Sequence, residues 1–313
     1  MRRTRSRRDF LKGIGLTAAG LAAATPASAG SPLVPPAKPG PVLPTVPFGK
    51  HRITRLIAGA NTIYGYSHFN QLFSAHMVEY HSTERVLAFL AELERAGLNT
   101  WQASWSERLE TDWLRYKDQG GKLQLLILSR PDFNDHPEIL PRVARLQPLG
   151  IAQHGARTNR YWQAGQIDRS LDYLKRIQDT GVMVGLSCHS PRELEYVEDK
   201  AWPVDYYMTS LYYLTRSRQD FEKLLGEVPL GEIYLPSDPP RMLSTIRRVK
   251  KTCLAYKVFA AGRTVDSAAQ VRERLAAALT GIKPTDAVIL GMYQRYTDQI
   301  GHNAQLVREI LKV

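Results

Sequence analysis

Short apolar runs alternate with amphipathic stretches eight times between residues 48 and 313. Runs of this length without polar alternation are typical of parallel strands that are buried on both faces. Eight strand–helix repeats in about 265 residues predict a single-domain α/β fold, the (β/α)₈ TIM barrel. The expected strands are Ile53–Gly59, Thr100–Ala103, Gln124–Ser129, Gly150–Gln153, Met183–Ser187, Asp205–Thr209, Cys253–Ala260 and Ala287–Gly291.

Helical periodicity fills the intervals between these runs. Apolar residues recur at helical spacing in Thr83–Ala96, and Ser190 with Glu193 forms a capping box with proline at the first helical position. A doubly wound sheet is the competing fold, but the turn Gly59–Gly65 lacks the G-x-G-x-x-G pattern. The other expected helices are Pro137–Leu146, Asp168–Thr180, Gln219–Leu225, Asp266–Leu279 and Asp298–Leu311.

The first residues have the pattern of a targeting segment. Ser6–Lys12 resembles the twin-arginine export signal, an apolar run follows, and Ala27-Ser28-Ala29 matches a signal-peptidase site. We therefore expect residues 1–29 to be a signal peptide, with an uncleaved membrane anchor as the alternative. The resemblance implies the twin-arginine translocase as a partner, a periplasmic or extracellular location, and no stable membrane span after cleavage. Residues 30–47 hold seven prolines and read as an extended linker. The barrel is expected over residues 48–313.

The net charge of the chain helps to decide which class of molecule it binds. The chain has 42 Lys+Arg and 30 Asp+Glu, a net charge of +12, and about +7 remains beyond residue 29. No basic stripe with interleaved aromatics is present, so we expect a small-molecule substrate and no nucleic acid. Only Cys188 and Cys253 are available for a disulfide, and both lie in or next to strands, which favours two separate thiols.

Chemistry in such a barrel takes place at the carboxyl ends of the strands. His68, His154 and His189 follow three different expected strands, and imidazole exchanges protons near neutral pH. Lys257 lies in an apolar run, where it either points inward for imine or base chemistry or snorkels outward. No H-x-H or H-E-x-x-H spacing occurs, so a metal is not indicated but stays open. The candidate catalytic residues are His68, Gln102, Arg130, His154, His189 and Lys257.

Several segments together resemble the aldo/keto reductase superfamily. They are Arg52–Gly59, Ala96–Thr100, Ile151–His154, Gly185–Ser190, Ala255–Gly262 and Leu290–Gly291 with Asn303. The resemblance implies that His154 is the family's active-site histidine and that the cofactor is NADP. It also implies the residues that would bind that cofactor, namely Ser187, Arg263, Arg295 and Asn303.

The departures from the family concern its catalytic tetrad of Asp, Tyr, Lys and His. Gln102 stands in place of the Asp, Trp105 and Ser106 stand near the Tyr position, and Arg130 stands in place of the Lys. A reductase needs a proton donor for the developing alkoxide, and these residues do not supply one. Three hypotheses therefore stay open. The first is a divergent oxidoreductase on a small polar carbonyl or sugar-like substrate. The second is a cofactor-free barrel that performs acid/base or metal-assisted chemistry on a sugar-like ligand, as an isomerase, lyase or hydrolase, and the third is a non-catalytic binding protein. Aromatic residues near the strand ends would suit stacking on a sugar-like ligand: Trp101, Trp105, Tyr161, Trp162, Tyr212 and Tyr213.

Overall fold

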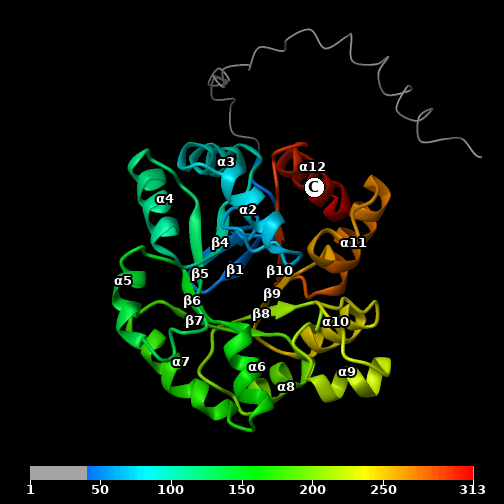
Figure 1. Ribbon diagram of the computed structural model, residues 1–313. Helices are drawn as coiled ribbons and strands as arrows, with labels where there is room; N and C mark the ends of the chain where they lie inside the picture. Colours follow the sequence, from blue (N-terminus) through cyan, green and yellow to red (C-terminus); the bar gives the residue numbers. More distant parts are fainter. Residues whose placement is uncertain (1–40, 313) are drawn as a thin grey trace, which may run out of the picture. The chain divides into compact units, whose positions relative to one another are not determined.

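The computed structural model describes residues 41–312, and it contains a closed barrel of eight parallel strands (Figure 1). Each strand pairs with the next one along the chain, and β10 pairs with β3 to close the ring. This confirms the predicted (β/α)₈ fold, while the expected signal peptide, residues 1–29, lies outside the described residues. The strands are β3 Leu56–Gly59, β4 Thr100–Ser104, β5 Gln124–Leu128, β6 Gly150–Gln153, β7 Met183–Cys188, β8 Tyr206–Ser210, β9 Thr252–Tyr256 and β10 Ala287–Gly291.

Helices surround the strands in a ring (Figure 1). The capping box predicted at Ser190 is present, and it starts the helix that follows β7. Four helices were not predicted, namely the first helix after β3, the helix after β4, the first helix after β6 and the second helix after β8. The helices are α2 Gln71–Tyr80, α3 Thr83–Arg95, α4 Glu107–Asp118, α5 Leu140–Ala144, α6 Gly155–Gln163, α7 Ser170–Asp179, α8 Pro191–Asp199, α9 Arg218–Leu225, α10 Asp238–Arg248, α11 Ala268–Gly281 and α12 Gln299–Leu311.

An antiparallel hairpin precedes the barrel and corrects two expectations. Its strands are β1 Thr45–Phe48 and β2 His51–Thr54. The expected strand Ile53–Gly59 is thus two strands, which break at Arg55, whose guanidinium turns to the carbonyls of Leu279, Lys283 and Asp286. The expected linker 30–47 also overlaps the folded unit, because β1 begins at residue 45.

The hairpin covers the amino-terminal end of the barrel. The backbone carbonyl of Arg52 accepts hydrogen bonds from Asn99 and Gln124, which stand at the starts of β4 and β5. Phe48 packs edge-on against Tyr206 inside the barrel, with 4.9 Å between the ring centroids. The opposite, carboxyl-terminal end therefore remains as the mouth.

Small residues inside the barrel make room for Tyr206, which is fully buried. A Cβ atom added at Gly185 would lie 2.4 Å from Tyr206 Cζ and 2.7 Å from the Cβ of Ala152. We expect Gly185→Ala to lower the free energy of unfolding by about 1–3 kcal/mol, since an overpacked core must shift to relieve the clash. Urea unfolding measures this. The double variant with Tyr206→Leu should recover part of the loss, and a Gly185→Ala protein as stable as the parent would contradict this packing.

Two further observations complete the fold. Cys188 and Cys253 are both buried free thiols, which agrees with the expectation of no disulfide. Within residues 41–312 we find no helix that has both the length and the apolar character needed to cross a bilayer.

Candidate active site

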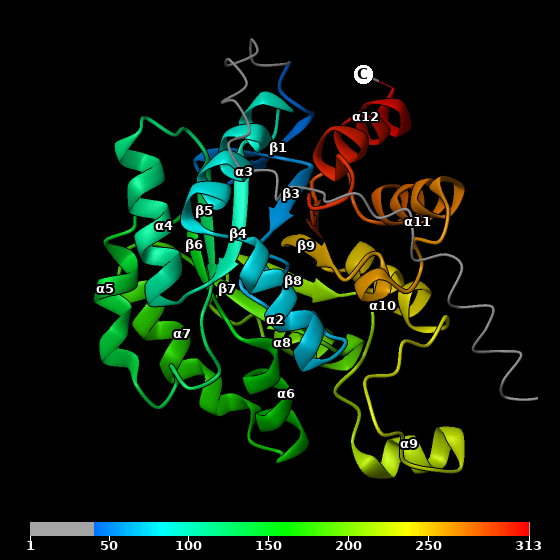
Figure 2. The ribbon, with the colours of Figure 1, turned by 45° about the horizontal axis from the view of Figure 1, so that its top comes forward.

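A cavity of about 650 Å³ opens at the carboxyl ends of β3, β4, β9 and β10. Residues from α2 and α12 also contribute to its wall, and Figure 2 shows α2 crossing in front of the strands. The volume is in the range of small-molecule sites. Its polar lining residues are Asn61, Thr62, Ser67, His68, Gln102, Lys257, Thr297, Asp298, Gln299, His302 and Asn303.

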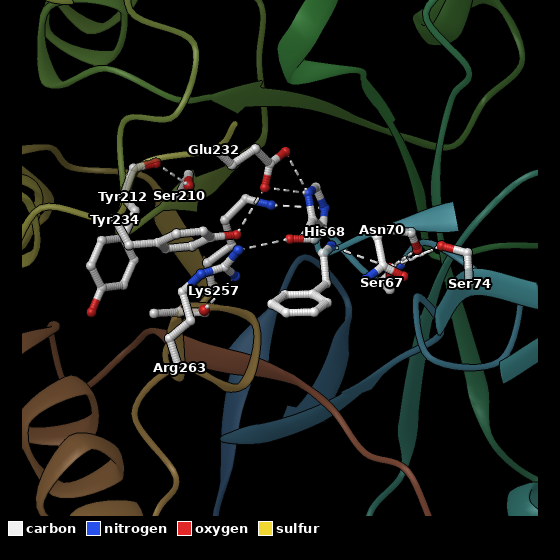
Figure 3. A network of polar contacts seen from close by, with 12 residues as sticks. Ser67, His68, Asn70, Ser74, Ser210, Tyr212, Glu232, Tyr234, Lys257 and Arg263 are labelled. Atoms are coloured by element: carbon white, nitrogen blue, oxygen red, sulfur yellow. Dashed lines mark hydrogen bonds and ion pairs between the residues drawn. The ribbon is translucent and has the colours of Figure 1, made fainter. Parts of the chain in front are cut away.

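Three side chains from distant parts of the chain form a hydrogen-bonded chain at this cavity. Lys257 Nζ lies 3.0 Å from Nε2 of His68. Nδ1 of His68 lies 2.8 and 3.0 Å from the two carboxylate oxygens of Glu232, which belongs to the segment 226–237 between α9 and α10 (Figure 3). Since Nδ1 donates to the carboxylate, Nε2 of a neutral His68 is the acceptor that faces the amine. The arrangement is that of a nucleophile, a base and a group that orients the base.

Both partners of the central contact have a left-handed backbone. The φ angle is +55° at His68 and +64° at Lys257. Non-glycine residues adopt this region at a cost, and such residues concentrate at functional sites. The sequence reading extended the strand through Lys257, but β9 ends at Tyr256. The change of φ takes Lys257 out of the strand and brings its side chain to the cavity.

The protonation of this chain follows from burial and nearby charge. Burial lowers the pKa of Lys257 to about 8, with the negative charge of Glu232 opposing the shift and Arg263 adding to it. Burial acts to raise the pKa of Glu232, but the hydrogen bond from His68, the nearby positive charge and the hydrogen bond from Tyr234 together hold that pKa below its usual value. Roughly a tenth of the Lys257 amine is therefore neutral at pH 7, which is far more than for an exposed lysine.

The other two predicted histidines lie beside this chain. His154 follows β6 and caps α6, accepting a hydrogen bond at Nδ1 from the Ala156 N–H over 3.1 Å. His189 follows β7 and is buried, and Nδ1 of its ring has no hydrogen-bond partner among the described residues. Burial, followed by the charge of Lys257, lowers the pKa of both imidazoles. Of the three predicted histidines, only His68 lines the cavity together with Lys257, and His189 lines a separate groove between α8, α9 and α10. The catalytic role of all four residues stays a prediction.

The pKa of His154, lowered to about 4, gives a pH prediction. The imidazole should stay neutral through pH 5, because protonation would place a cation in a buried site near Lys257. The unfolded chain takes up this proton near pH 6.5, so the contribution of His154 to stability is complete above 6.5 and declines toward pH 4. NMR titration of the ring resonances, assigned with a His154→Asn variant, measures this. A midpoint near 6.5 would contradict the buried placement.

The remaining predicted site residues divide between the cavity and the surface. Gln102 is buried in the wall of the cavity. Ser187 is buried and lies 3.0 Å, between hydroxyl oxygens, from Tyr256. Arg130 is instead exposed, pairs with Asp132 two residues further on, and is not among the residues that line the cavity.

The expected cofactor-binding residues are likewise only partly in the cavity. Asn303 is buried in its wall. Arg263 does not line the cavity, and its guanidinium donates to the carbonyl of His68 and stacks at 4.4 Å from the ring centroid of Tyr234. Arg295 also lies outside and contacts His76 at 3.2 Å. The two arginines expected to hold phosphate groups thus have protein partners.

Metal ligation and aromatic stacking were the other expectations for the mouth. Within residues 41–312, no three His, Cys, Asp or Glu side chains are grouped so that they could hold a metal ion. Trp101 and Trp105 are buried in the hydrophobic core. Trp162 and Tyr213 line a second groove, of about 1120 Å³, between α8, α9 and α10. The predicted aromatic residues therefore do not form one stacking surface in the cavity.

Sequence reasoning missed Glu232. We selected candidate residues from the positions that directly follow strands. Glu232 lies in the segment 226–237 between two helices, so this selection did not include it. Its position next to Gly231 in a proline-containing stretch has no catalytic signature. Tyr234, whose hydroxyl donates to Glu232 over 3.0 Å, was missed for the same reason.

Comparisons with known proteins support the fold of this chain but do not identify a family. No protein-family model matches the chain, and no curated protein sequence matches it either. Among solved structures it is similar to a truncated 3-deoxy-D-arabino-heptulosonate 7-phosphate synthase from Thermotoga maritima, with TM-score 0.51, 13% identity and coverage of 87% of this chain and 92% of that chain. It is also similar to Gox0644 in its apo form, with TM-score 0.51, 12% identity and coverage of 86% and 94%. A glycerol dehydrogenase, AKR11B4 from Gluconobacter oxydans, gives TM-score 0.46 at 12% identity over 85% and 94%.

At these identities the likeness shows the fold alone. The fold and the site define this chain as a (β/α)₈-barrel protein with a lysine–histidine–glutamate chain at the mouth of the barrel.

Proposed function

We propose that this protein is a barrel enzyme that forms an imine between Lys257 and a carbonyl compound, and so acts as a lyase or isomerase. The observation that carries the proposal is the 3.0 Å contact between Lys257 Nζ and His68 Nε2, with Glu232 on the other nitrogen of the ring. A lysine is a nucleophile only as the neutral amine, and here a base lies within reach of its proton. This proposal combines the cofactor-free hypothesis with the imine chemistry that the sequence allowed for an inward-pointing Lys257.

The step balances with the residues present. Lys257 gives one proton to His68, and the resulting imidazolium is held by the Glu232 carboxylate. The neutral amine attacks the carbonyl carbon, and a proton passes from nitrogen to the carbonyl oxygen to form a carbinolamine. His68 returns its proton to the hydroxyl, which leaves as water, so a protonated C=N bond remains. That bond draws electrons from the adjacent carbon, which is what a lyase or isomerase of this kind requires.

Reductive trapping tests the proposal. Sodium borohydride converts an imine irreversibly to a secondary amine, so the probe glycolaldehyde, a small polar carbonyl compound, should add a fixed mass to the protein. Peptide mapping is expected to locate that mass at Lys257 at probe concentrations that leave the exposed Lys223 unmodified. Equal labelling of both lysines would refute the proposal, because it would mean that Lys257 has no special reactivity.

A second candidate is a nicotinamide-dependent oxidoreductase acting on a small polar carbonyl or sugar-like substrate. One observation favours it: the cavity lies between β9, β10 and α12, the segments that resemble the reductase cofactor region, and Asn303 is in its wall. Against it, the expected phosphate ligands Arg263 and Arg295 do not line the cavity, so the residues fit NADP only in part.

A titration with NADPH, followed through the tryptophan fluorescence, distinguishes the two candidates. Saturable binding that weakens in Asn303→Leu would favour the oxidoreductase. Absence of binding at millimolar NADPH would leave the imine chemistry as the function to pursue.

We also propose that the protein works outside the cytoplasm after twin-arginine export, on the strength of the Ser6–Lys12 pattern. The mass of the exported protein is expected to begin at Gly30. Recovery of an intact Met1 in the exported fraction would contradict this.

A further inference from the structure

The cavity beside Lys257 has walls that are mainly apolar. Val258 and Phe259 contribute from the segment after β9, Ile289 from β10, and Phe73 and Met77 from α2. A water-poor wall of this kind disfavours the charged form of the lysine, and it also selects what can bind next to it. Transfer of apolar ligand surface into such a cavity is favourable, whereas a strongly hydrated group loses its water there.

An aromatic cluster connects the cavity with the molecular surface. Phe73 and Tyr293 line the cavity, and their ring centroids lie 6.2 Å apart at an interplanar angle of 90°. Phe69 extends the cluster from Phe73 at 6.4 Å, and Tyr296 extends it from Tyr293 at 6.1 Å. Both outer rings are solvent-exposed, at 67% for Phe69 and 71% for Tyr296. Contiguous exposed apolar patches, unlike single exposed residues, mark ligand-binding grooves and other interaction sites.

Charge at the cavity is sparse and already balanced. Lys257 is the only Lys or Arg among its lining residues within 41–312, and Glu232 lies on the far side of His68 from it. The carboxylate of Asp298, which caps α12, is also in the wall and repels anions. The separate groove between α8, α9 and α10 is more basic, since Arg192, Lys223 and Arg241 are among its lining residues. A phosphate or carboxylate would find no guanidinium in the cavity.

We infer that the carbonyl compound that reacts at Lys257 is uncharged and carries an aromatic group, which lies against Phe73 and Tyr293. This rests on the proposed function, since it names the substrate class of that same site. It differs from the sugar-like ligand of the sequence-based hypotheses, because the rings of Phe73 and Tyr293 offer apolar contact area and not hydrogen bonds to several hydroxyl groups.

The experiment compares two aldehydes in the borohydride trapping reaction at Lys257. Cinnamaldehyde is uncharged and aromatic, and glyceraldehyde 3-phosphate is anionic and aliphatic. We expect half-maximal labelling with cinnamaldehyde at a concentration at least about tenfold lower. In Phe73→Ala that concentration should rise about fivefold to tenfold, as the loss of an aromatic contact implies. Leu72→Ala, an exposed neighbour on α2, is the matched control and should leave it unchanged.

The outcomes separate the substrate class from the imine chemistry. Preference for glyceraldehyde 3-phosphate, or a Phe73→Ala protein that is labelled like the parent, overturns the inference while the imine mechanism stands. Calorimetry of Lys257→Met with cinnamyl alcohol, which has no carbonyl group, measures binding of the aromatic group in the absence of imine formation. Binding that weakens with Phe73→Ala supports the aromatic site even if no aldehyde is trapped, and absence of binding overturns it. Displacement of cinnamyl alcohol by NADPH would assign the cavity to the dinucleotide and also overturn it.

Discussion

Replacing Lys257 with methionine is expected to lower the rate of imine trapping by more than about 10³-fold, because the reacting amine is gone. The fold should persist. Methionine has a similar length and no charge, and removing a buried ammonium from an apolar wall also removes its desolvation cost. We therefore expect the Tm of Lys257→Met to equal or exceed that of the parent.

The trapping rate of the parent protein should depend on pH in a defined way. Below the pKa of about 8 for Lys257, each unit of pH raises the neutral fraction, and hence the rate, by about tenfold. Above pH 8 the rate should level off. Lys223→Met serves as the control, since it removes an exposed lysine from α9 and should alter neither the rate nor its pH profile. A rate that keeps rising to pH 10 would mean that an ordinary surface lysine is being trapped.

Replacing Asp238 with alanine is expected to be among the most destabilising single changes, at about 3–5 kcal/mol of unfolding free energy. Asp238 and Arg216 form a buried ion pair, with side-chain exposures of 4% and 7%. The same carboxylate accepts a hydrogen bond from the backbone N–H of Tyr213 over 3.2 Å. Removing it leaves a guanidinium buried without a carboxylate, and the loop after β8 loses its anchor to α10.

An exposed ion pair provides the control for this prediction. Arg248 and Glu195 pair on the surface with exposures of 64% and 40%, so Arg248→Ala should cost less than about 1 kcal/mol. Guanidinium chloride unfolding of the two variants measures the difference. Because Asp238 begins α10 directly after the segment that carries Glu232, Asp238→Ala should also slow trapping at Lys257. Equal stability of the two variants would show that the buried pair is not strongly coupled to folding.

The prediction of the barrel succeeded because its strands are locally recognisable. A strand with both faces buried needs an unbroken apolar run, and runs such as Gly150–Gln153 match β6 without change. Since all barrel strands point the same way, the residues that follow them must meet at one mouth. That rule was enough to bring His68, His154 and His189 to one region from distant positions in the chain.

The sequence did not predict which side chains after the strands enter the cavity. Arg130 follows a strand, yet it is exposed and pairs with the Asp132 carboxylate, and it does not line the cavity. Arg295 likewise contacts His76 outside the cavity. The amino-acid sequence did not indicate where β9 ends. Lys257 leaves the strand through a positive φ angle, and the pattern of apolar residues does not encode that angle.

By itself, the sequence determined the (β/α)₈ architecture and the end of the barrel at which chemistry is possible, because hydrophobic periodicity and strand polarity are properties of local segments. Only the tertiary structure decided that Glu232 supports His68, and so that Lys257 has a base beside it. Their separation along the chain, 164 residues between His68 and Glu232, carries no local pattern. Contacts between loops depend on how the whole barrel positions its strand ends, and they leave no periodic pattern in the sequence.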